Sequence, residues 1–238
     1  KNEITELTQD GFITGTKRYE VGKSIYDFYI QEWAGVDPED GYGMWYKDIL
    51  DVDGEPTGEK ETTKVYAEAT RYYQETALPD VTGGFNSDLV IGNFDFNMLF
   101  NFAFGGTFYD SSYAGLMDGF SRPGYTASPD ISGRWQKPGD VTDIPLLLNA
   151  NNDFNATSTR FLYDNDYVRL KAITFGYTLK STSTTNIFVD SLRFYLRGDN
   201  LFTWQSHEGI DPEQNLAGTT NNRSSILKTI SFGVNVKF

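Results

Sequence analysis

The sequence of 238 residues contains no cysteine, a single histidine and no long apolar run. Without cysteine, a disulfide scaffold, a thiolate zinc site and a cysteine nucleophile are all excluded. A two-histidine metal site is excluded as well, and any Ser-His-Asp arrangement would have to use His207. No stretch approaches the roughly 18 apolar residues that a membrane-spanning helix needs, which excludes a helical membrane protein.

Positive charge is also scarce. The chain has 20 Lys and Arg against 33 Asp and Glu, for a net charge of −13. Nucleic-acid binding rests on a cationic excess, so we expect no nucleic-acid partner. Aromatic residues, in contrast, make up 16% of a chain whose mean hydropathy is only −0.45, and so many aromatics argue against disorder.

The strongest pattern is the alternation between residues 94 and 104. Every even position is Phe or Met, and the odd positions are Asp, Asn, Leu and Ala. Period-two alternation predicts a β-strand with one apolar face and one mostly polar face. Its length fits the roughly 9–11 residues of a tilted membrane-crossing strand, whereas strands of soluble proteins are usually nearer 5–6.

Further segments alternate in the same way. The expected strands, about six in all, cover residues 24–34, 81–90, 93–105, 166–179, 191–204 and 226–238. Residues 91–92 predict a tight hairpin, and Gly-Asp-Asn at 198–200 could form a bulge. The connections alternate between long and short, which in an up-and-down sheet places all long loops at one end. Outer-membrane barrels show this asymmetry, with short periplasmic turns and long extracellular loops.

A soluble β-sandwich is the alternative fold, because its strands also alternate and its connections can be long. As a function it corresponds to a soluble glycan-binding or enzymatic domain. The nearly unbroken phenylalanine face and the uniform Asn and Asp on the other face argue against it. The chain shows no cluster of convergent acids and bases, so we expect no enzyme and no cofactor.

Several motifs resemble the SusC/RagA-like family of TonB-dependent outer-membrane transporters. In chain order they are VGKSIYDFY at 21–29, WAGVDP at 33–38, LPDVTGGF at 78–85, GNFDF at 92–96, FGGTFYD at 104–110, DYVRLKAITFGY at 166–177, LRGDNLFTW at 196–204 and TISFGVNVKF at 229–238. Together they cover nearly the whole chain, whereas roughly 40–75 and 110–160 match no known motif.

The resemblance implies an all-β fold: residues 1–238 would be the C-terminal segment of a large transmembrane β-barrel, with the plug domain and the N-terminal strands absent from this chain. Such barrels have about 22 strands. Because lipid tolerates no open sheet edge, the chain is expected to be a split subunit, a proteolytic fragment or an incomplete sequence, paired with the remaining barrel.

The resemblance also implies a function. We expect energised import of a bulky nutrient across the outer membrane of a Gram-negative, Bacteroidota-type bacterium, with a glycan favoured over a peptide. A SusD-like surface lipoprotein would sit on the extracellular loops, and TonB would act through the plug. Neither sugar linkage nor peptide preference can be read from the sequence.

Polar residues of the strands would point into the lumen if the aromatics face lipid. They are Asp27, Gln31, Asn93, Asp95, Asn97, Asn101, Arg193, Tyr195 and Arg197. Solvating the wall and bonding to a plug is the favoured role, with substrate contact near the extracellular end as the alternative. By parity with Phe175, Arg169 and Lys171 are expected to face outward and to snorkel towards head groups.

Other candidates lie in the loops and the last strand. Loop aromatics suit packing within the loops or against a partner, with glycan contact as the second choice, namely Tyr42, Trp45, Tyr46, Tyr113 and Trp135. The last strand resembles the signal read by the barrel assembly machinery, through Phe232, Val234, Val236 and Phe238. The acidic loop 51–55 departs from calcium-loop spacing, so it is interpreted as an acidic surface loop with an adventitious cation site as the alternative, and no residue is assigned as a metal ligand.

Overall fold

The computed structural model describes residues 2–118, 124–148, 153–180, 189–213, 215–220 and 225–238. The chain forms two compact units. Unit 1 comprises residues 1–78, 107–163 and 214–222, and unit 2 comprises 79–106, 164–213 and 223–238, each so far as it is described. Within the described ranges no helix is both long and apolar enough to cross a bilayer.

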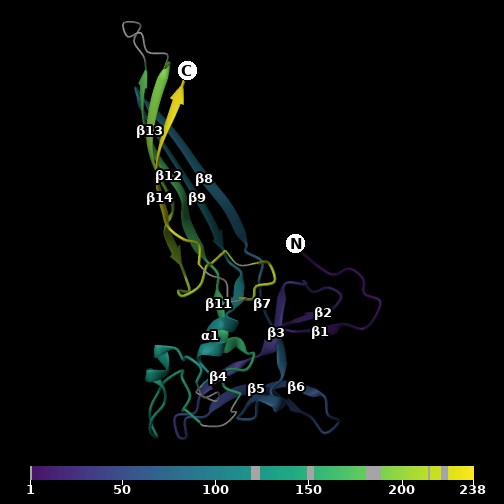
Figure 1. Ribbon diagram of the computed structural model, residues 1–238. Helices are drawn as coiled ribbons and strands as arrows, with labels where there is room; N and C mark the ends of the chain where they lie inside the picture. The colour runs from purple at the N-terminus through teal and green to yellow at the C-terminus, as the bar shows by residue number, and fades with distance from the viewer. Residues whose placement is uncertain (1, 119–123, 149–152, 181–188, 214, 221–224) are drawn as a thin grey trace. The chain divides into compact units, whose positions relative to one another are not determined.

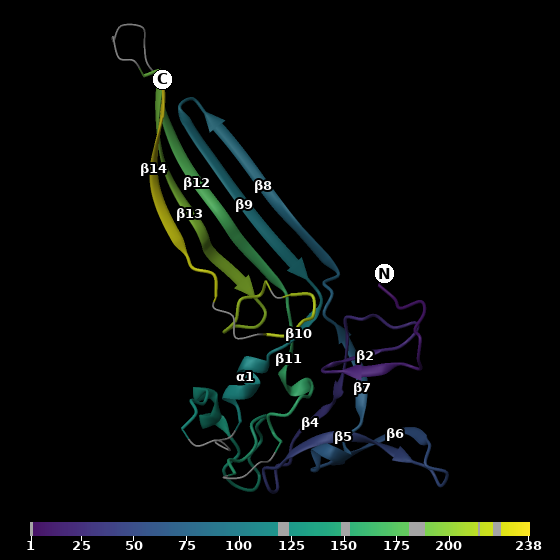
Figure 2. The same ribbon diagram turned by 45° about the vertical axis from the view of Figure 1, so that its right-hand side comes forward.

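Unit 2 is a single sheet of five long antiparallel strands, which lie side by side in both views (Figure 1, Figure 2). The order is β14-β13-β12-β9-β8, so neighbours in the sheet are also successive along the chain among these strands. Their bounds are β8 Val81–Ile91, β9 Phe94–Phe104, β12 Tyr167–Lys180, β13 Ser191–Gln205 and β14 Thr229–Lys237. The strands predicted from alternation over these five segments are confirmed.

The predicted hairpin between β8 and β9 is present, with its turn at Gly92 and Asn93. Ile91 pairs with Phe94 across it, and Gly92 adopts φ +62°. Positive φ at the first turn residue suits glycine, since a two-residue hairpin turn must match the twist of its strands. At the opposite end of the sheet, Val81 pairs with Phe104 and Tyr167 with Gln205, so the long connections leave from one end. The connection over 181–188 lies outside the described residues.

Unit 1 is built from short strands. A four-stranded sheet holds β1 Phe12–Thr14, β2 Lys17–Tyr19, β3 Asp27–Gln31 and β7 Arg71–Thr76, and a three-stranded sheet holds β4 Trp33–Val36, β5 Gly43–Leu50 and β6 Pro56–Thr63. A two-stranded sheet pairs β10 Thr107–Tyr109 with β11 Leu162–Asp164. The helical elements are α1 Ser111–Leu116 and the 3-10 turns Tyr66–Glu68, Pro129–Gly133 and Thr159–Phe161.

The core of unit 1 gathers residues that are far apart in the chain. Its buried members are Phe28, Ala77, Tyr109, Ala114, Met117, Ile131 and Phe161. Asp110 caps α1 by accepting a hydrogen bond from the Tyr113 N–H at 2.9 Å, which fixes the start of the helix beside this core.

The segment 24–34 differs from its prediction as one strand in the long sheet. It forms β3 and β4, which belong to two different sheets of unit 1. The alternation is real, but Phe28 and Ile30, both 0% exposed, face a protein core. Alternation reports one apolar face and does not say whether protein or lipid covers it.

Candidate functional site

One face of unit 2 is apolar and uncovered. Phe85, Phe175, Leu196 and Phe232, from four different strands, are between 51% and 71% exposed. Aromatic rings on this face meet across strands, as Phe94 does with Phe175 at 5.7 Å between ring centroids. A β-sandwich would bury such a face against a second sheet. The alternative of a soluble sandwich is therefore wrong for the described residues of unit 2.

The opposite face of the same sheet is polar. Its centre is an ion pair between Asp95 on β9 and Arg193 on β13, with Nε to Oδ1 at 2.9 Å. The pair spans the intervening strand β12 at Gly176, where a Cβ atom would overlap the Asp95 carboxylate. A glycine is therefore required at this crossing, because only a bare backbone leaves room for the bridge.

Other predicted lumen-facing residues lie along the same face. Asn97 donates to Asp88 at 2.6 Å and to Asn86 at 3.1 Å, and Arg197 pairs with Asp199 at 2.8 Å. The ring of Tyr195 lies 4.9 Å from the Arg193 guanidinium carbon and covers the position of Gly233. Asn101 pairs in register with Arg169 on β12.

Three predicted lumen residues lie elsewhere. Asn93 occupies the exposed hairpin turn rather than a strand. Asp27 and Gln31 are in β3 of unit 1, and Gln31 is only 7% exposed. The parity argument placed Asp27 and Gln31 on the long sheet, which is wrong because that segment pairs with β7 instead.

A double irregularity interrupts the long sheet. The register of β12 shifts between Leu170 and Ala172 against both neighbours, so Lys171 is an extra residue relative to β9. On β13, Asp199 pairs with Ala172 and Phe202 with Leu170, which leaves Asn200, at φ +54°, inside the bulge suspected from the sequence. An extra residue in a strand reverses which face the following side chains occupy.

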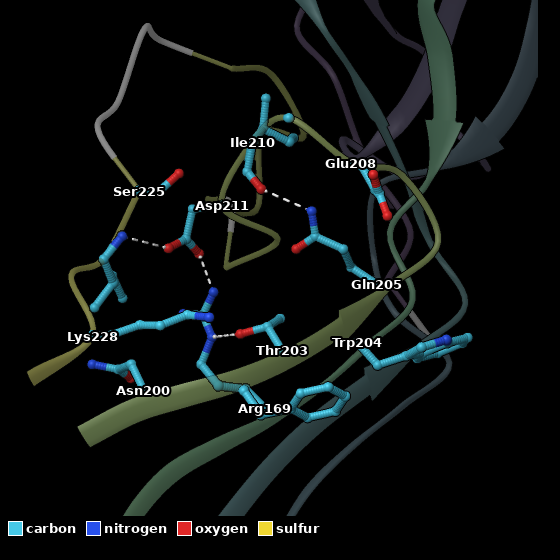
Figure 3. A pocket seen from close by; sticks show the side chains of 13 residues that line it. Arg169, Asn200, Thr203, Trp204, Gln205, Glu208, Ile210, Asp211, Ser225 and Lys228 are labelled. Atoms are coloured by element: carbon cyan, nitrogen blue, oxygen red, sulfur yellow. Dashed lines mark hydrogen bonds and ion pairs between the residues drawn. The ribbon is translucent and has the colours of Figure 1, made fainter. Parts of the chain in front are cut away.

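Arg169 therefore faces the polar side, and its predicted outward, snorkelling orientation is wrong. The side chain is 4% exposed, and Figure 3 shows its guanidinium beside Thr203 and Asp211. Nε donates to Thr203 Oγ1 at 3.0 Å, Nη2 to Asp211 at 2.9 Å and Nη1 to Glu213 at 2.9 Å. The sequence signal for this reversal is the change of apolar parity from Val168 and Leu170 to Ile173 and Phe175.

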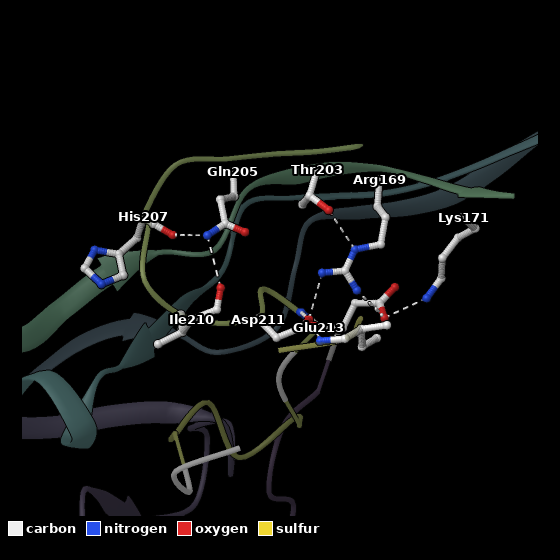
Figure 4. A network of polar contacts seen from close by, with 9 residues as sticks. Arg169, Lys171, Thr203, Gln205, His207, Ile210, Asp211 and Glu213 are labelled. Atoms are coloured by element: carbon white, nitrogen blue, oxygen red, sulfur yellow. Dashed lines mark hydrogen bonds and ion pairs between the residues drawn. The ribbon is translucent and has the colours of Figure 1, made fainter. Parts of the chain in front are cut away.

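Asp211 and Glu213 were missed by the sequence reasoning. They lie in the segment after β13, and Figure 4 shows the polar network that ties this segment to the sheet. Lys171 joins it through Glu213 at 2.7 Å. Burial disfavours the charged form of Asp211, but the backbone N–H of Glu213, the Arg169 guanidinium and the N–H of Ile226 all donate to it, so its pKa is lowered overall.

A cavity of about 570 Å³ opens beside this network (Figure 3). Arg169, Asn200, Trp204, Gln205, Asp211 and Lys228 are among the residues that line it. It lies where β13 continues past Asp199 without β14 as a neighbour, because β14 begins only at Thr229. Gln205 Nε2 closes the loop next to it by donating to the carbonyl oxygens of His207 at 2.8 Å and Ile210 at 3.1 Å.

The predicted contact residues of the loops are mostly packed within unit 1. Trp45 is 1% exposed and contacts Trp33 and Tyr66 at 5.2 and 5.4 Å between ring centroids. The prediction that Trp45 contacts a ligand or a partner is therefore wrong, because its ring is buried in the core.

The remaining loop aromatics are more accessible. Tyr42 is 37% exposed and meets Phe154 edge-on at 6.0 Å, and Tyr46 is partly buried below Lys60. Tyr113 donates to Asp130 at 2.8 Å, and Trp135 donates to the Pro38 carbonyl oxygen at 3.0 Å. Of these four residues, Tyr113 lines a cavity in unit 1.

Three of the predicted assembly residues lie on the apolar face of β14, and Phe238 follows the last residue of that strand, Lys237. Phe232, Val234, Val236 and Phe238 are 71%, 43%, 46% and 82% exposed. In the acidic loop 51–55, Asp51 Oδ1 accepts from the N–H groups of Asp53 and Glu55, so it closes a turn. Among the described residues, no group of three or more His, Asp or Glu side chains could hold a metal ion.

Comparison with solved structures defines the class of fold. The chain superposes on a chain of the RagAB peptide transporter with a TM-score of 0.80, 24% identity and 99% of this chain covered, and on its "open-open" state with a TM-score of 0.76 and 22% identity. It spans 26% and 25% of those chains. The fold is therefore that of a segment of a much larger transporter chain.

Sequence comparison shows that the chain is similar to a TonB-dependent receptor. The chain is 31% identical over 232 residues to TonB-dependent receptor P3 of Formosa agariphila, which covers 91% of this chain and 22% of that receptor. No family profile matches the sequence. The chain thus spans about a fifth of the curated relative, and the resemblance to TonB-dependent transporters that its motifs indicate is confirmed.

Proposed function

We propose that this chain supplies wall strands and connecting loops to a TonB-dependent importer of a bulky nutrient in the outer membrane of a Gram-negative, Bacteroidota-type bacterium. Its role is transport and not catalysis. The observation that carries the proposal is the division of unit 2 into an uncovered apolar face and a polar face bridged by ion pairs. Transmembrane barrels alternate in this way, apolar towards lipid and polar towards the lumen.

Strand length supports the same role. β8 and β9 have 11 residues each, and a tilted strand needs roughly 9–11 to cross the apolar layer. On this proposal Phe85, Phe175 and Phe232 meet lipid, whereas Asp95, Asn97 and Arg193 line the lumen. There they keep the wall wet and offer hydrogen bonds to a plug.

The two outer strands of the sheet imply further partners. β8 and β14 each have one hydrogen-bonded neighbour among the described strands, and an open edge is not tolerated in lipid. We propose that the remaining barrel strands, outside residues 1–238, pair with both edges and enclose a plug that TonB acts on. A SusD-like surface lipoprotein covering the long connections completes the importer.

For the nutrient we propose an oligosaccharide in preference to a peptide. Exposed Tyr42 lies close in sequence to Asp37 and Asp40, a combination in which a ring face can stack on a sugar while carboxylates take its hydroxyls. RagAB, which shares the fold, is a peptide transporter, so any uptake assay has to include peptides as the comparison.

For β14 we propose a role in assembly. Phe232, Val234, Val236 and Phe238 present an exposed apolar row that the barrel assembly machinery can recognise. Replacing Phe232 and Phe238 by Ala together should lower the amount of folded receptor in the outer membrane. The matched control is Ser231→Ala with Asn235→Ala on the other face, which should leave that amount unchanged.

The function is tested in the native host with the complete receptor. Membrane fractionation should place it in the outer membrane, and uptake of fluorescent oligosaccharides should stop when TonB is deleted while binding to cells persists. Release of the receptor into buffer without detergent would overturn the wall proposal. Uptake that continues without TonB would overturn the importer proposal, and uptake of labelled peptides alone would reverse the order of the two nutrients.

A further inference from the structure

A second cavity, of about 350 Å³, lies within unit 1 and is walled by aromatic rings. Trp33, Tyr113, Phe161 and Tyr163 contribute rings, and Arg160 and Asp143 contribute the charges. The cavity combines an apolar lining with two charged side chains, which is the usual composition of a small-molecule site.

Arg160 is held in place by its surroundings. Its guanidinium carbon lies 5.0 Å from the Trp33 ring centroid and 4.9 Å from that of Phe161, and Nη1 donates to the Phe154 carbonyl oxygen at 2.6 Å. The backbone is fixed as well, since the Trp33 N–H donates to Thr159 Oγ1 at 2.9 Å. Stacking on rings is favourable for a guanidinium and pre-orients its planar donors.

Arg160 has no carboxylate within ion-pair distance among the described residues of unit 1, although Asp143 lines the same cavity. Its one hydrogen bond among these residues goes to a neutral carbonyl. Burial lowers the pKa of Arg160 to about 10, partly offset by Tyr163, Tyr113, Asp143 and Tyr109, so it stays protonated at neutral pH. A partly buried cation without a paired counter-ion is costly, and its spare N–H groups match a carboxylate in a two-pronged arrangement.

We propose that this cavity binds a carboxylate-bearing unit of the imported nutrient, with Arg160 holding the carboxylate and the rings of Trp33 and Phe161 packing beside it. The inference rests on the proposed import function and narrows its substrate to an acidic class. A uronic-acid sugar and an acidic peptide residue both present this group. Asp143, at the same cavity, disfavours a second negative charge nearby and so tunes the affinity.

The test measures binding to the complete receptor purified in detergent, by calorimetry, with trigalacturonate and with a blocked tripeptide containing one Glu. Their neutral counterparts are the fully methyl-esterified trigalacturonate and the same tripeptide with Gln. At least one acidic probe should bind more tightly than its neutral counterpart by about 10-fold or more, and which acid does so identifies the source of the carboxylate.

Arg160→Gln should reduce the binding of that acidic probe by about 10- to 100-fold and leave the neutral probe unchanged. The matched control is Arg71→Gln, because Arg71 also lies in unit 1 and also donates to a backbone carbonyl, that of Gly15 at 3.2 Å. Asp143→Asn leaves Arg160 in place and should tighten binding of the acidic probe by about 2- to 5-fold, which no folding defect would imitate.

Equal binding of acidic and neutral probes, or acidic binding that survives Arg160→Gln, would overturn the carboxylate site. Failure of both acidic probes to bind would overturn it as well. None of these results bears on membrane location or on dependence on TonB, so the proposed import function would stand or fall separately.

Discussion

The two units of this chain use their aromatic residues in opposite ways. In unit 1, Phe28 and Trp45 are 0% and 1% exposed and sit inside a core, whereas in unit 2 Phe85 and Phe232 are 54% and 71% exposed. Burial of aromatic area is the main favourable term for a fold in water. In unit 1 the aromatic rings are buried by other residues of the same unit. In unit 2 the rings stay exposed, so an apolar phase outside the unit would have to cover them.

The largest effect should come from emptying the core of unit 1. Phe28→Ala should lower the free energy of unfolding by about 3–5 kcal/mol, because it leaves a cavity and removes the ring over which Lys17 lies at 3.3 Å. Val52→Ala, at a fully exposed position (101%), should change it by less than about 0.5 kcal/mol. Urea titrations of the complete receptor, followed by tryptophan fluorescence, give both values. Similar losses for the two variants would contradict the assignment of Phe28 to a core.

The next effect concerns the tie between β12 and the segment after β13. Arg169→Met should lower the free energy of unfolding by about 3–5 kcal/mol, because it leaves the buried carboxylate of Asp211 without its cation. Lys171→Met should lower the free energy of unfolding by about 1 kcal/mol or less, since the Lys171 side chain is 25% exposed and Glu213 still pairs with Arg169. Thermal unfolding of the two variants in the same detergent compares them directly.

The same tie gives a pH dependence. The pKa of Asp211 is lowered in the folded chain, so its contribution to stability is present above the ordinary value of 3.8. It is lost as the pH falls from that value through the lowered one. The stability gap between the parent chain and Arg169→Met should therefore be full at pH 6 and shrink at low pH, as Asp211 becomes protonated in the two folded chains. A gap that stays constant down to pH 2 would show that Asp211 is not the partner that matters.

Arg169 also shows what the sequence can and cannot predict. Alternation fixed five strands, the hairpin and most of the polar face, because a period of two depends on neighbouring residues only. The bulge at Lys171 exchanges the two faces of the strand. In the sequence it shows only as a change of the apolar positions from even to odd numbers between Leu170 and Ile173. The small strands of unit 1 and the Arg160 cavity depend on contacts such as Trp33 with Thr159, which lie 126 residues apart. No local pattern encodes such pairs.

The proposal that one face of unit 2 meets lipid can be tested with substitutions at two neighbouring positions of β9. Phe96→Arg should raise the free energy of folding into phospholipid vesicles by about 2–4 kcal/mol if Phe96 lies near the bilayer midplane. Asn97→Arg, one residue further and on the polar face, should change it by well under 1 kcal/mol, because Arg can extend into water. Equal effects at the two positions would mean that the faces are not divided between lipid and water.

The smallest expected effect concerns the Asp95–Arg193 ion pair on the polar face of unit 2. Asp95 and Arg193 are 29% and 28% exposed in their side chains, so their ion pair should contribute only about 0.2–1 kcal/mol. Asp95→Asn removes the charge, whereas Gly176→Val removes the space through which the bridge passes. Both variants break the same ion pair, so the double variant should lower the folding free energy by less than the two single variants combined, with a coupling of about 0.2–1 kcal/mol. Folding free energies of all four chains in vesicles measure this coupling. Strict additivity would mean that Gly176 is required for some other reason, and the bridge across β12 would lose its explanation.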